Sequence, residues 1–561
     1  MRTVILCLVY SAMFLATSAQ SFHEKEIGKQ IDSLVALQLK DGTPGGVVGV
    51  ILKGEIVYQQ NYGLMNLGQK MPVDEQTLFD IASVAKQFTA FAVLLLENEG
   101  KLQLDEDIRT YLPDLPDFGY NITVRHLLQH TSGIASTDVL RLFAGISLDE
   151  TWTQQDEIAL IASYPMLNFE PNTQFTYSNA GYSLLARIVE TVSRMDFASF
   201  LKANIFDPLQ MNSAFVNDRA GKAVEHMAIG YKVEEEEFAP CSSTEDYNYG
   251  SGNIFLSLQD MIKWGKNFFS PTIGNERLIL NIFDRYNTLA NGDSIDYTYG
   301  FFVREHKGIK MVEHSGGVPG FRNQLILFPD EDLLIIAMFN NEDIATRRLS
   351  LGIAELMLAG KMVEETPRPR VAIDIDHENL HAFEGTFQMP DGMELTFSLE
   401  QDTFWLKLPG APNFQLFAES NTKFFLKAFD AQCTFTVASD GTVDEMIWHQ
   451  GGGDYVAVRV GERKPLQPNE LADFTGLYIQ EDLKADYRIT YQDEQLSLQV
   501  PHTFKTYLGF DQAILSHING DKFLTDKLGM LQFTRDGQGQ LNGFILLDVG
   551  RLQNIKFVKQ R

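Results

Sequence analysis

Cysteine and positive charge are both scarce in this chain of 561 residues. Its three cysteines are Cys7, in the first apolar stretch, and the widely separated Cys241 and Cys433, which have no Cys or His neighbour at metal-ligand spacing. We therefore expect no disulfide framework. Lys and Arg number 46 against 74 Asp and Glu, giving a net charge of −28. That balance argues against nucleic acid and anionic membranes as partners.

Long apolar runs are also rare, and the clearest one lies at the N-terminus. Arg2 precedes an apolar run, which ends in the small residues Ala16–Ala19. This pattern predicts a signal peptide over residues 1–19, with an uncleaved anchor as the alternative. No later stretch is long and apolar enough to span a bilayer. We expect a secreted or periplasmic protein without stable membrane insertion after cleavage.

The length is too great for one hydrophobic core. Two charged, Pro-containing stretches, Glu364–Arg370 and Gly461–Pro468, are typical of solvated linkers. They divide the chain into a large domain over 20–362 and smaller ones over 373–461 and 470–561.

The large domain has strand-like segments at both ends and helices between them. Gly46–Tyr62 predicts two strands with a turn at Lys53–Gly54, and four strand-like runs lie between Tyr297 and Asn340. Helical patterns cover 22–40, 83–99 and 345–360, among others. The pattern predicts an α+β domain, an antiparallel sheet flanked by helices.

The tail is different, because the helix signal vanishes after residue 370 and an internal repeat appears. Phe383–Phe387 is echoed by Phe474–Tyr478 about 90 residues later. We interpret the tail as two small all-β domains, antiparallel barrels or sandwiches. A homo-oligomer assembled through this tail is one role left open for it.

Ser83 and Lys86 stand three residues apart at the start of an apolar stretch. On a helix this spacing puts hydroxyl and amine on one face, one turn apart. Apolar surroundings would lower the pKa of the Lys86 ammonium and make it a base beside a nucleophile. The same spacing occurs twice more in the chain, so these residues alone favour the alternative of a capping serine and a lysine reaching water.

Two later segments carry further candidate site residues. Tyr177 could move protons and Asn179 could orient a substrate carbonyl; alternatively, Asn179 caps a helix while Tyr177 packs. His314 could bind a substrate carboxylate or assist proton transfer, and the backbone of Gly316 and Gly317 could bind an oxyanion. The alternative is a hairpin end with a surface histidine.

Together these segments resemble the serine hydrolases of the class C β-lactamase and penicillin-recognising D-alanyl-D-alanine carboxypeptidase family. That family carries Ser-x-x-Lys, Tyr-x-Asn and Lys/His-x-Gly motifs in this order on one α+β fold. The phrases Leu127–Gly133 and Gly316–Phe321 are also similar. The resemblance covers about residues 25–360. The β-rich tail resembles barrel-like domains appended to some members.

The resemblance implies acyl transfer without a metal or cofactor. Ser83 Oγ would attack a carbonyl and pass its proton to Lys86, Tyr177 or the pair. Backbone N–H groups of Ser83 and Gly317 would bind the oxyanion, while Asn179 and His314 orient the substrate. Class C β-lactamases usually have lysine at position 314, so histidine argues against efficient β-lactam hydrolysis.

The resemblance predicts an exported serine hydrolase acting on amide or ester bonds of a small peptide, ester or β-lactam. We expect a D-amino-acid-specific peptidase, carboxypeptidase or esterase. The alternatives are a penicillin- or peptidoglycan-binding protein without turnover, and a true β-lactamase. A competing zinc motif, His377–His381, has no evident third ligand and stands just before a strand start, so we interpret it as a short capped turn.

Overall fold

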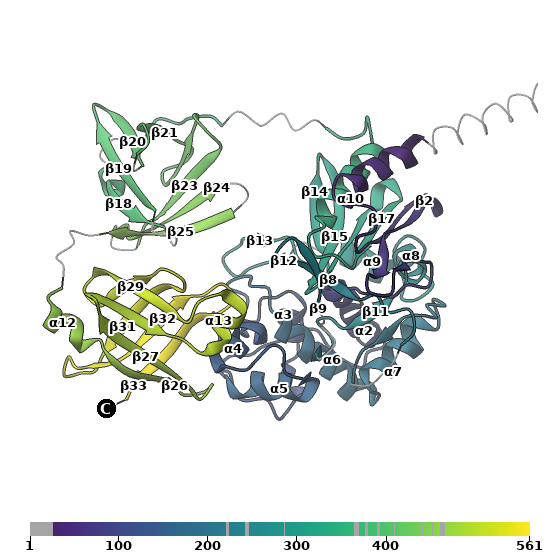
Figure 1. The fold of residues 1–561 in the computed structure, drawn as a ribbon, viewed down its shortest axis with the longest axis horizontal. Coiled ribbons are helices and arrows are strands. Elements are labelled where there is room, and N and C mark those ends of the chain that lie inside the picture. Colours follow the sequence, from purple (N-terminus) through teal and green to yellow (C-terminus); the bar gives the residue numbers. More distant parts are fainter. Residues whose placement is uncertain are drawn as a thin grey trace, which may run out of the picture. The chain divides into compact units, whose positions relative to one another are not determined.

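The computed structural model describes the chain from residue 26 to residue 560 with short gaps. The described ranges are 26–219, 224–241, 246–284, 287–363, 370–375, 380–389, 393–408, 410–438, 441–450, 453–460 and 466–560. The predicted signal peptide and most of both predicted linkers lie outside them. The chain divides into two compact units, Met1–Asp138 with Asp149–Glu364 and Val139–Leu148 with Glu365–Arg561 (Figure 1).

The first unit is built on a six-stranded antiparallel sheet in the order β14-β15-β16-β17-β1-β2. Its strands are β1 Gly46–Leu52, β2 Glu55–Tyr62, β14 Phe302–His306, β15 Ile309–Val318, β16 Phe321–Phe328 and β17 Leu333–Phe339. Pairing of β1 with β17 joins the two ends of the unit. The turn between β1 and β2 lies at Lys53 and Gly54, which take φ of +52° and +82°. The predicted antiparallel sheet is confirmed.

Helices cover both faces of this sheet. Along β17, Leu334, Ile336 and Met338 belong to one core with α2 and α8, whereas Leu333 and Ile335 face α10 and the helix over 26–36. This alternation follows from the two-residue period of a strand, with both faces buried. The helices of the unit are α2 Lys86–Asn98, α3 Val124–Leu128, α5 Gln154–Ser163, α6 Asn179–Ser193, α7 Phe197–Leu201, α8 Leu258–Asn267, α9 Glu276–Asp284 and α10 Thr346–Met357. Helix α4, Thr137–Ala144, begins in this unit and continues into the second.

Short strands complete the first unit. They are β3 Leu64–Asn66, β4 Met71–Pro72, β5 Phe79–Asp80, β6 Trp152–Thr153, β7 Phe215–Val216, β8 Gly230–Glu234, β9 Glu237–Cys241, β10 Asp246–Tyr247, β11 Ile254–Leu256, β12 Asn287–Thr288 and β13 Ser294–Ile295. Two predicted boundaries were wrong. The strand expected from Tyr297 starts at Phe302, because the chain turns at Gly300 (φ +82°), which lies against the backbone of Lys86 and Gln87. The segment around His314 is not a connection, because β15 runs through it.

The tail forms two closed barrels of eight strands each. The first contains β18 Gly385–Gln388, β19 Glu394–Glu400, β20 Thr403–Lys407, β21 Phe414–Ala418, β22 Lys423–Leu426, β23 Ala431–Thr436, β24 Glu445–Gln450 and β25 Gly453–Val460. The second contains β26 Gly476–Gln480, β27 Ala485–Gln492, β28 Gln495–Gln499, β29 Gln512–Asn519, β30 Lys522–Thr525, β31 Gly529–Arg535, β32 Leu541–Asp548 and β33 Gln553–Lys559, with helices α12 Pro468–Asp473 and α13 His502–Leu508. Of the two predicted options, barrels and sandwiches, the barrels are confirmed.

The second unit also includes residues 139–148, which the sequence analysis placed in the large domain. Phe143 of this segment packs against aromatic rings of the second barrel. Tyr487 Oη donates to the Phe143 carbonyl at 2.7 Å, and Thr503 Oγ1 donates to the Leu142 carbonyl at 2.8 Å. A stretch from the first third of the chain therefore completes a unit otherwise built from its C-terminal part.

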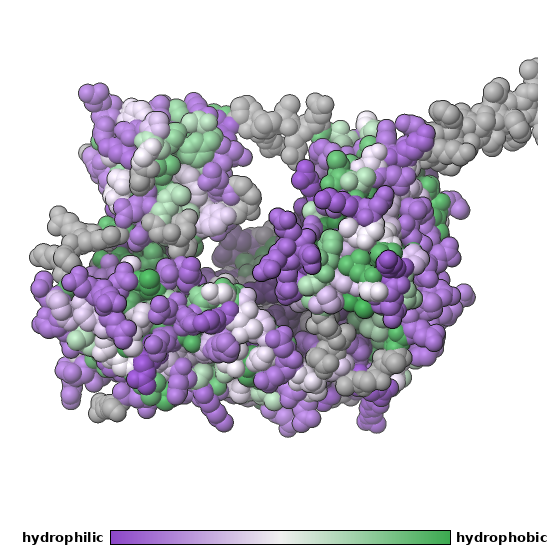
Figure 2. All heavy atoms as spheres, in the orientation of Figure 1, coloured by the Kyte–Doolittle hydropathy of each residue, from purple (hydrophilic) through white to green (hydrophobic). Residues whose placement is uncertain are grey.

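The described cysteines and the surface can be compared with the composition of the chain. Cys241 and Cys433 are both free thiols. The face of the molecule in Figure 2 is mainly hydrophilic over both units, in keeping with the high charge. Within the described ranges, no helix combines the length and apolarity needed to cross a bilayer.

Candidate active site

Ser83 lies in a tight turn between strand β5 and helix α2. The 3₁₀ helix η1, Ala82–Ala85, begins with Ala82 in the left-handed region at φ +49°. The Ala82 N–H donates to Asp80 Oδ1 at 2.8 Å, and Asn323 Nδ2 donates to the Asp80 carbonyl at 2.9 Å. No side chain caps η1, so the capping role considered for Ser83 is excluded. The Ser83 side chain is instead partly exposed next to Lys86.

Lys86 is the most deeply buried charged side chain of this region, with 0% exposure. Its Nζ donates to Ser83 Oγ at 3.2 Å and to Asn179 Oδ1 at 2.8 Å. A third hydrogen bond, at 2.8 Å, goes to the carbonyl of Ser251. The ring centroid of Tyr177 lies 4.9 Å from Nζ. Lys86 therefore does not reach water, and the surface alternative is wrong.

Asn179 is the first residue of α6, and its amide joins Lys86 to an acidic residue. The N-cap of this helix is Ser178, which makes no side-chain capping bond, so the capping alternative for Asn179 is also wrong. Asn179 Oδ1 accepts from Lys86, while Nδ2 donates to Asp138 Oδ2 at 2.7 Å. A donor on one side and an acceptor on the other fix the orientation of the amide.

His314 lies within β15 and is only 2% exposed, so it is not a surface residue. Its Nδ1 is 2.6 Å from the Ser315 carbonyl, which can only accept, so Nδ1 carries the hydrogen and Nε2 accepts from Tyr297 Oη at 3.1 Å. Burial lowers the pKa of His314 to about 3, and the charge of Lys86 contributes. The ring is thus neutral near pH 7, and any contact with substrate involves a neutral imidazole.

Gly316 brings β15 against the turn that carries the nucleophile. A Cβ on Gly316 would lie 2.2 Å from the carbonyl oxygen of Ile81, two residues before Ser83. Only glycine permits this approach. A Cβ on Gly317 would point elsewhere, with side-chain atoms of Arg322 nearest at 3.6 Å. The oxyanion-binding role of the Ser83 and Gly317 N–H groups remains a prediction.

The structure thus brings together the side chains predicted from three distant segments. Ser83, Lys86 and Asn179 form one hydrogen-bonded group with the Tyr177 ring beside it, and the His314 ring centroid lies 6.2 Å from that of Tyr177.

Sequence reasoning missed Ser251, Asp138 and Tyr297. Ser251 carried a signal, because it stands between two glycines, and Gly250 has φ +99° with no room for a Cβ beside Tyr182. Asp138 and Tyr297 carried none.

No metal centre is evident in the parts of the chain that the structure describes, where no group of three or more His, Cys, Asp or Glu could hold an ion. Of the zinc motif considered above, residues 377–379 lie outside the described ranges. His381 lies in the single turn η5, His381–Phe383, where its Nδ1 is 2.7 Å from Glu384 Oε2.

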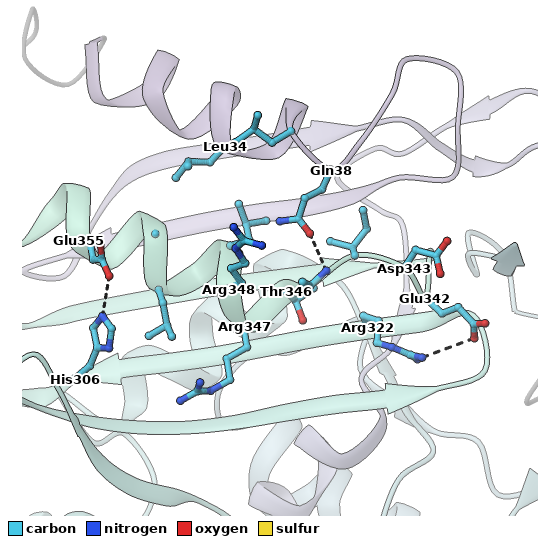
Figure 3. Close-up of a pocket in the computed structure, with 16 residues that line it drawn as sticks. Leu34, Gln38, His306, Arg322, Glu342, Asp343, Thr346, Arg347, Arg348 and Glu355 are labelled. Carbon is cyan, nitrogen blue, oxygen red and sulfur yellow. Dashed lines mark hydrogen bonds and ion pairs between the residues drawn. The ribbon is translucent and has the colours of Figure 1, made fainter. Parts of the chain in front are cut away.

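A cavity of about 1130 Å³ lies beside α10, and Ser83 is not among the residues that line it (Figure 3). It is lined by Leu34 and Gln38 near the N-terminal helix and by Arg347 and Arg348 of α10. Gln38 Oε1 accepts from the backbone N–H just before α10. The residues next to Ser83 and the residues of α10 pack into separate hydrophobic cores of the first unit. This cavity is therefore not the site of the nucleophile.

Comparison with known families gives matches in both parts of the chain. The model of the Beta-lactamase family matches residues 29–356. The chain belongs to this family. A second model, a domain of unknown function (DUF3471), matches residues 369–458, which include the first barrel up to β25.

The curated relatives include a penicillin-binding protein and a D-aminopeptidase. The chain is 31% identical over 425 residues to penicillin-binding protein 4* of Bacillus subtilis, which covers 72% of this chain and 93% of the relative. It is 29% identical over 301 residues to D-aminopeptidase of Brucella anthropi, which covers 53% of this chain and 56% of the relative.

Solved structures share the fold. The octameric penicillin-binding protein homologue from Pyrococcus abyssi aligns with TM-score 0.54 at 22% identity, covering 77% of this chain and 99% of the homologue. D-amino acid amidase from Ochrobactrum anthropi aligns with TM-score 0.51 at 23% identity, covering 60% and 98%. The predicted family and its α+β fold are confirmed.

Proposed function

We propose that this protein is an exported serine hydrolase that forms an acyl-enzyme at Ser83 on amide or ester bonds of D-amino-acid substrates. The observation that carries the proposal is the hydrogen bond of Lys86 Nζ to Ser83 Oγ in a buried setting. A nucleophile within reach of a base that is itself held by other groups is the arrangement that activates a hydroxyl. Asn179 and Ser251 hold Lys86 in this way.

The reaction proceeds in two steps. Ser83 Oγ forms a bond to the substrate carbonyl carbon as its proton passes to Lys86, with Tyr177 as the other candidate base. The tetrahedral oxyanion collapses, and the leaving amine or alcohol departs with that proton. Water then attacks the ester carbonyl and gives a proton to the same base. That proton passes to Ser83 Oγ as the acyl–Oγ bond breaks, which releases the acid and restores Ser83 and the base.

The charges of the site bear on the substrate. His314 is neutral, and the carboxylate next to Asn179 is that of the exposed Asp138. Neither of these two residues offers a positive charge to a substrate carboxylate, so they favour an aminopeptidase, amidase or esterase over a carboxypeptidase. The relatives named D-aminopeptidase and D-amino acid amidase support the D-amino-acid preference.

The test is covalent labelling of the full chain with an activated phosphonate, followed by mass spectrometry of the modified peptide. We expect modification of Ser83 and turnover of p-nitrophenyl esters and D-aminoacyl p-nitroanilides. Ser83→Ala should lose both. Ser199→Ala is the matched control, because the exposed Ser199 has the same spacing to a lysine and should behave as wild type. Activity that survives Ser83→Ala would sink the proposal.

A fluorescent penicillin distinguishes the non-turnover alternative. A stable adduct at Ser83 without turnover of any ester or amide would identify a penicillin-binding protein instead, the name that the Bacillus relative carries.

Export and assembly are further parts of the proposal. We infer that residues 1–19 direct export, which N-terminal sequencing of the secreted or periplasmic protein tests. Self-association is in keeping with the homologue described as octameric, and we infer that it runs through the β-rich tail. Light scattering of the full-length protein would show a single-chain mass if this is wrong.

A further inference from the structure

A buried carboxyl group that no predicted role includes is connected to Asn179 by hydrogen bonds. Glu157 of α5 is 1% exposed and has three donors around it. Its Oε1 accepts from Thr137 Oγ1 at 2.5 Å and from Ser183 Oγ at 3.2 Å. Its Oε2 accepts from Trp152 Nε1 at 2.9 Å. The three donors come from α4, α6 and β6, so this one carboxyl joins three elements.

Two of these contacts lead directly to Asn179. Thr137 precedes Asp138, whose carboxylate accepts from Asn179 Nδ2 at 2.7 Å. Ser183 lies one helical turn after Asn179, and its Oγ is also 3.4 Å from the Asn179 carbonyl. Glu157 thereby connects both partners of the Asp138–Asn179 hydrogen bond.

We propose that Glu157 is a positioning residue of the active site, which holds Asp138 against Asn179 and so orients the amide that contacts Lys86. The inference rests on the proposed hydrolase activity, since it assigns a role in that reaction. Glu157 acts on the site through its neighbours Thr137 and Ser183.

The ionised carboxylate suits this arrangement, because it only accepts hydrogen bonds. A protonated carboxyl must donate once. The indole N–H of Trp152 cannot accept, so Thr137 or Ser183 would have to turn its hydroxyl and give up its own donation. Protonation therefore changes one of the two contacts that lead to Asn179.

Burial of Glu157 places this change near neutral pH. Burial raises the pKa of Glu157 to about 7, against the opposing hydrogen bonds from Thr137 and Trp152. The charged groups that face it are Asp138 of α4 and Asp246 of β10, and both add to the rise. The positioning contact is therefore expected to be fully formed only above about pH 7.

Two variants test the proposal in the full-length protein. In Glu157→Gln, the amide oxygen can still accept from Trp152 while its NH₂ donates to Thr137, so the fold should persist without the ionisation. Thr137→Val removes the hydroxyl that donates to Glu157. Glu150→Gln is the control, because it removes an equal charge from an exposed position seven residues earlier.

The readout is kcat/KM for a p-nitrophenyl ester from about pH 5.5 to pH 8.5, with phosphonate labelling alongside. Wild type and Glu150→Gln should show a rise through about pH 7 that Glu157→Gln lacks. Above that pH, Glu157→Gln and Thr137→Val should each be about tenfold slower, since small displacements of positioned groups reduce rates strongly. The double variant should be no slower than either single one, because both remove the same contact.

An unchanged pH profile in Glu157→Gln, or additive losses in the double variant, would overturn the role of Glu157 while labelling of Ser83 remains normal. Absence of Ser83 labelling in the wild type would instead overturn the proposed function itself. If Glu157→Gln does not fold, wild-type rates in a folded Thr137→Val overturn the role, and a tenfold loss there supports it.

Discussion

Replacing Gly316 by alanine would measure how closely β15 must approach the nucleophile. The new Cβ would lie 2.2 Å from the Ile81 carbonyl oxygen and 3.2 Å from Val84 Cγ2. A Cβ does not come closer than about 3 Å to such an atom, so the strand or the turn must move by about 1 Å. A displacement of about 1 Å in an active site reduces rates about 100-fold. We therefore expect kcat/KM to fall by about that factor, with a loss of about 1–3 kcal/mol in the free energy of unfolding.

Gly49→Ala is the matched control in the same sheet. Its Cβ would meet Leu258 Cδ1 at 3.1 Å, the end of a flexible side chain that can turn away. Ester hydrolysis, phosphonate labelling and thermal unfolding are measured on both variants, so that loss of activity is separated from loss of fold. The reasoning is refuted if folded Gly316→Ala keeps kcat/KM within threefold of wild type, or if Gly49→Ala loses as much.

Two further predictions concern stability. Because the pKa of His314 falls from 6.5 to about 3 on folding, the folded state loses stability as pH drops below about 6.5. Urea unfolding should show wild type losing about 3 kcal/mol more than His314→Gln between pH 7 and pH 4, and equal losses would contradict this. Tyr487→Phe removes the donor to the Phe143 carbonyl and should cost about 1–2 kcal/mol in chemical unfolding. The exposed Tyr455→Phe should change nothing.

Much of the fold could be predicted from sequence because its signals are local. The hairpin turn at Lys53–Gly54 contains a glycine, which takes positive φ without a steric penalty, and another glycine, Gly100 (φ +71°), follows the end of α2. The two barrels were visible in the sequence as a repeat, since each has its own alternation of apolar residues. No such signal marked residues 139–148 as part of the second unit, because their place depends on contacts with residues far away in sequence, such as Tyr487.

The candidate site was predictable as a set of residues but not as a chemical arrangement. Taken alone, the Ser83 and Lys86 pair also fitted a capping serine beside a surface lysine. The burial of Lys86 in the folded structure excludes this alternative. That burial depends on Asn179 and the Ser251 carbonyl, which lie 93 and 165 residues away in sequence. The hydrogen bond from Thr137 to Glu157, which connects Glu157 to Asp138 and Asn179, also could not be predicted from the sequence pattern.

The sequence by itself determined the elements, the repeat in the tail and the order of three motifs, because periodicity, turn chemistry and spacing are written into neighbouring residues. Tertiary structure alone decided that Lys86 is buried and that His314 is neutral. It also decided that a carboxyl group, Glu157, is connected to the Asp138–Asn179 pair. The physical reason is that solvation and hydrogen-bond partners set the protonation and orientation of a side chain, and folding supplies both from distant segments.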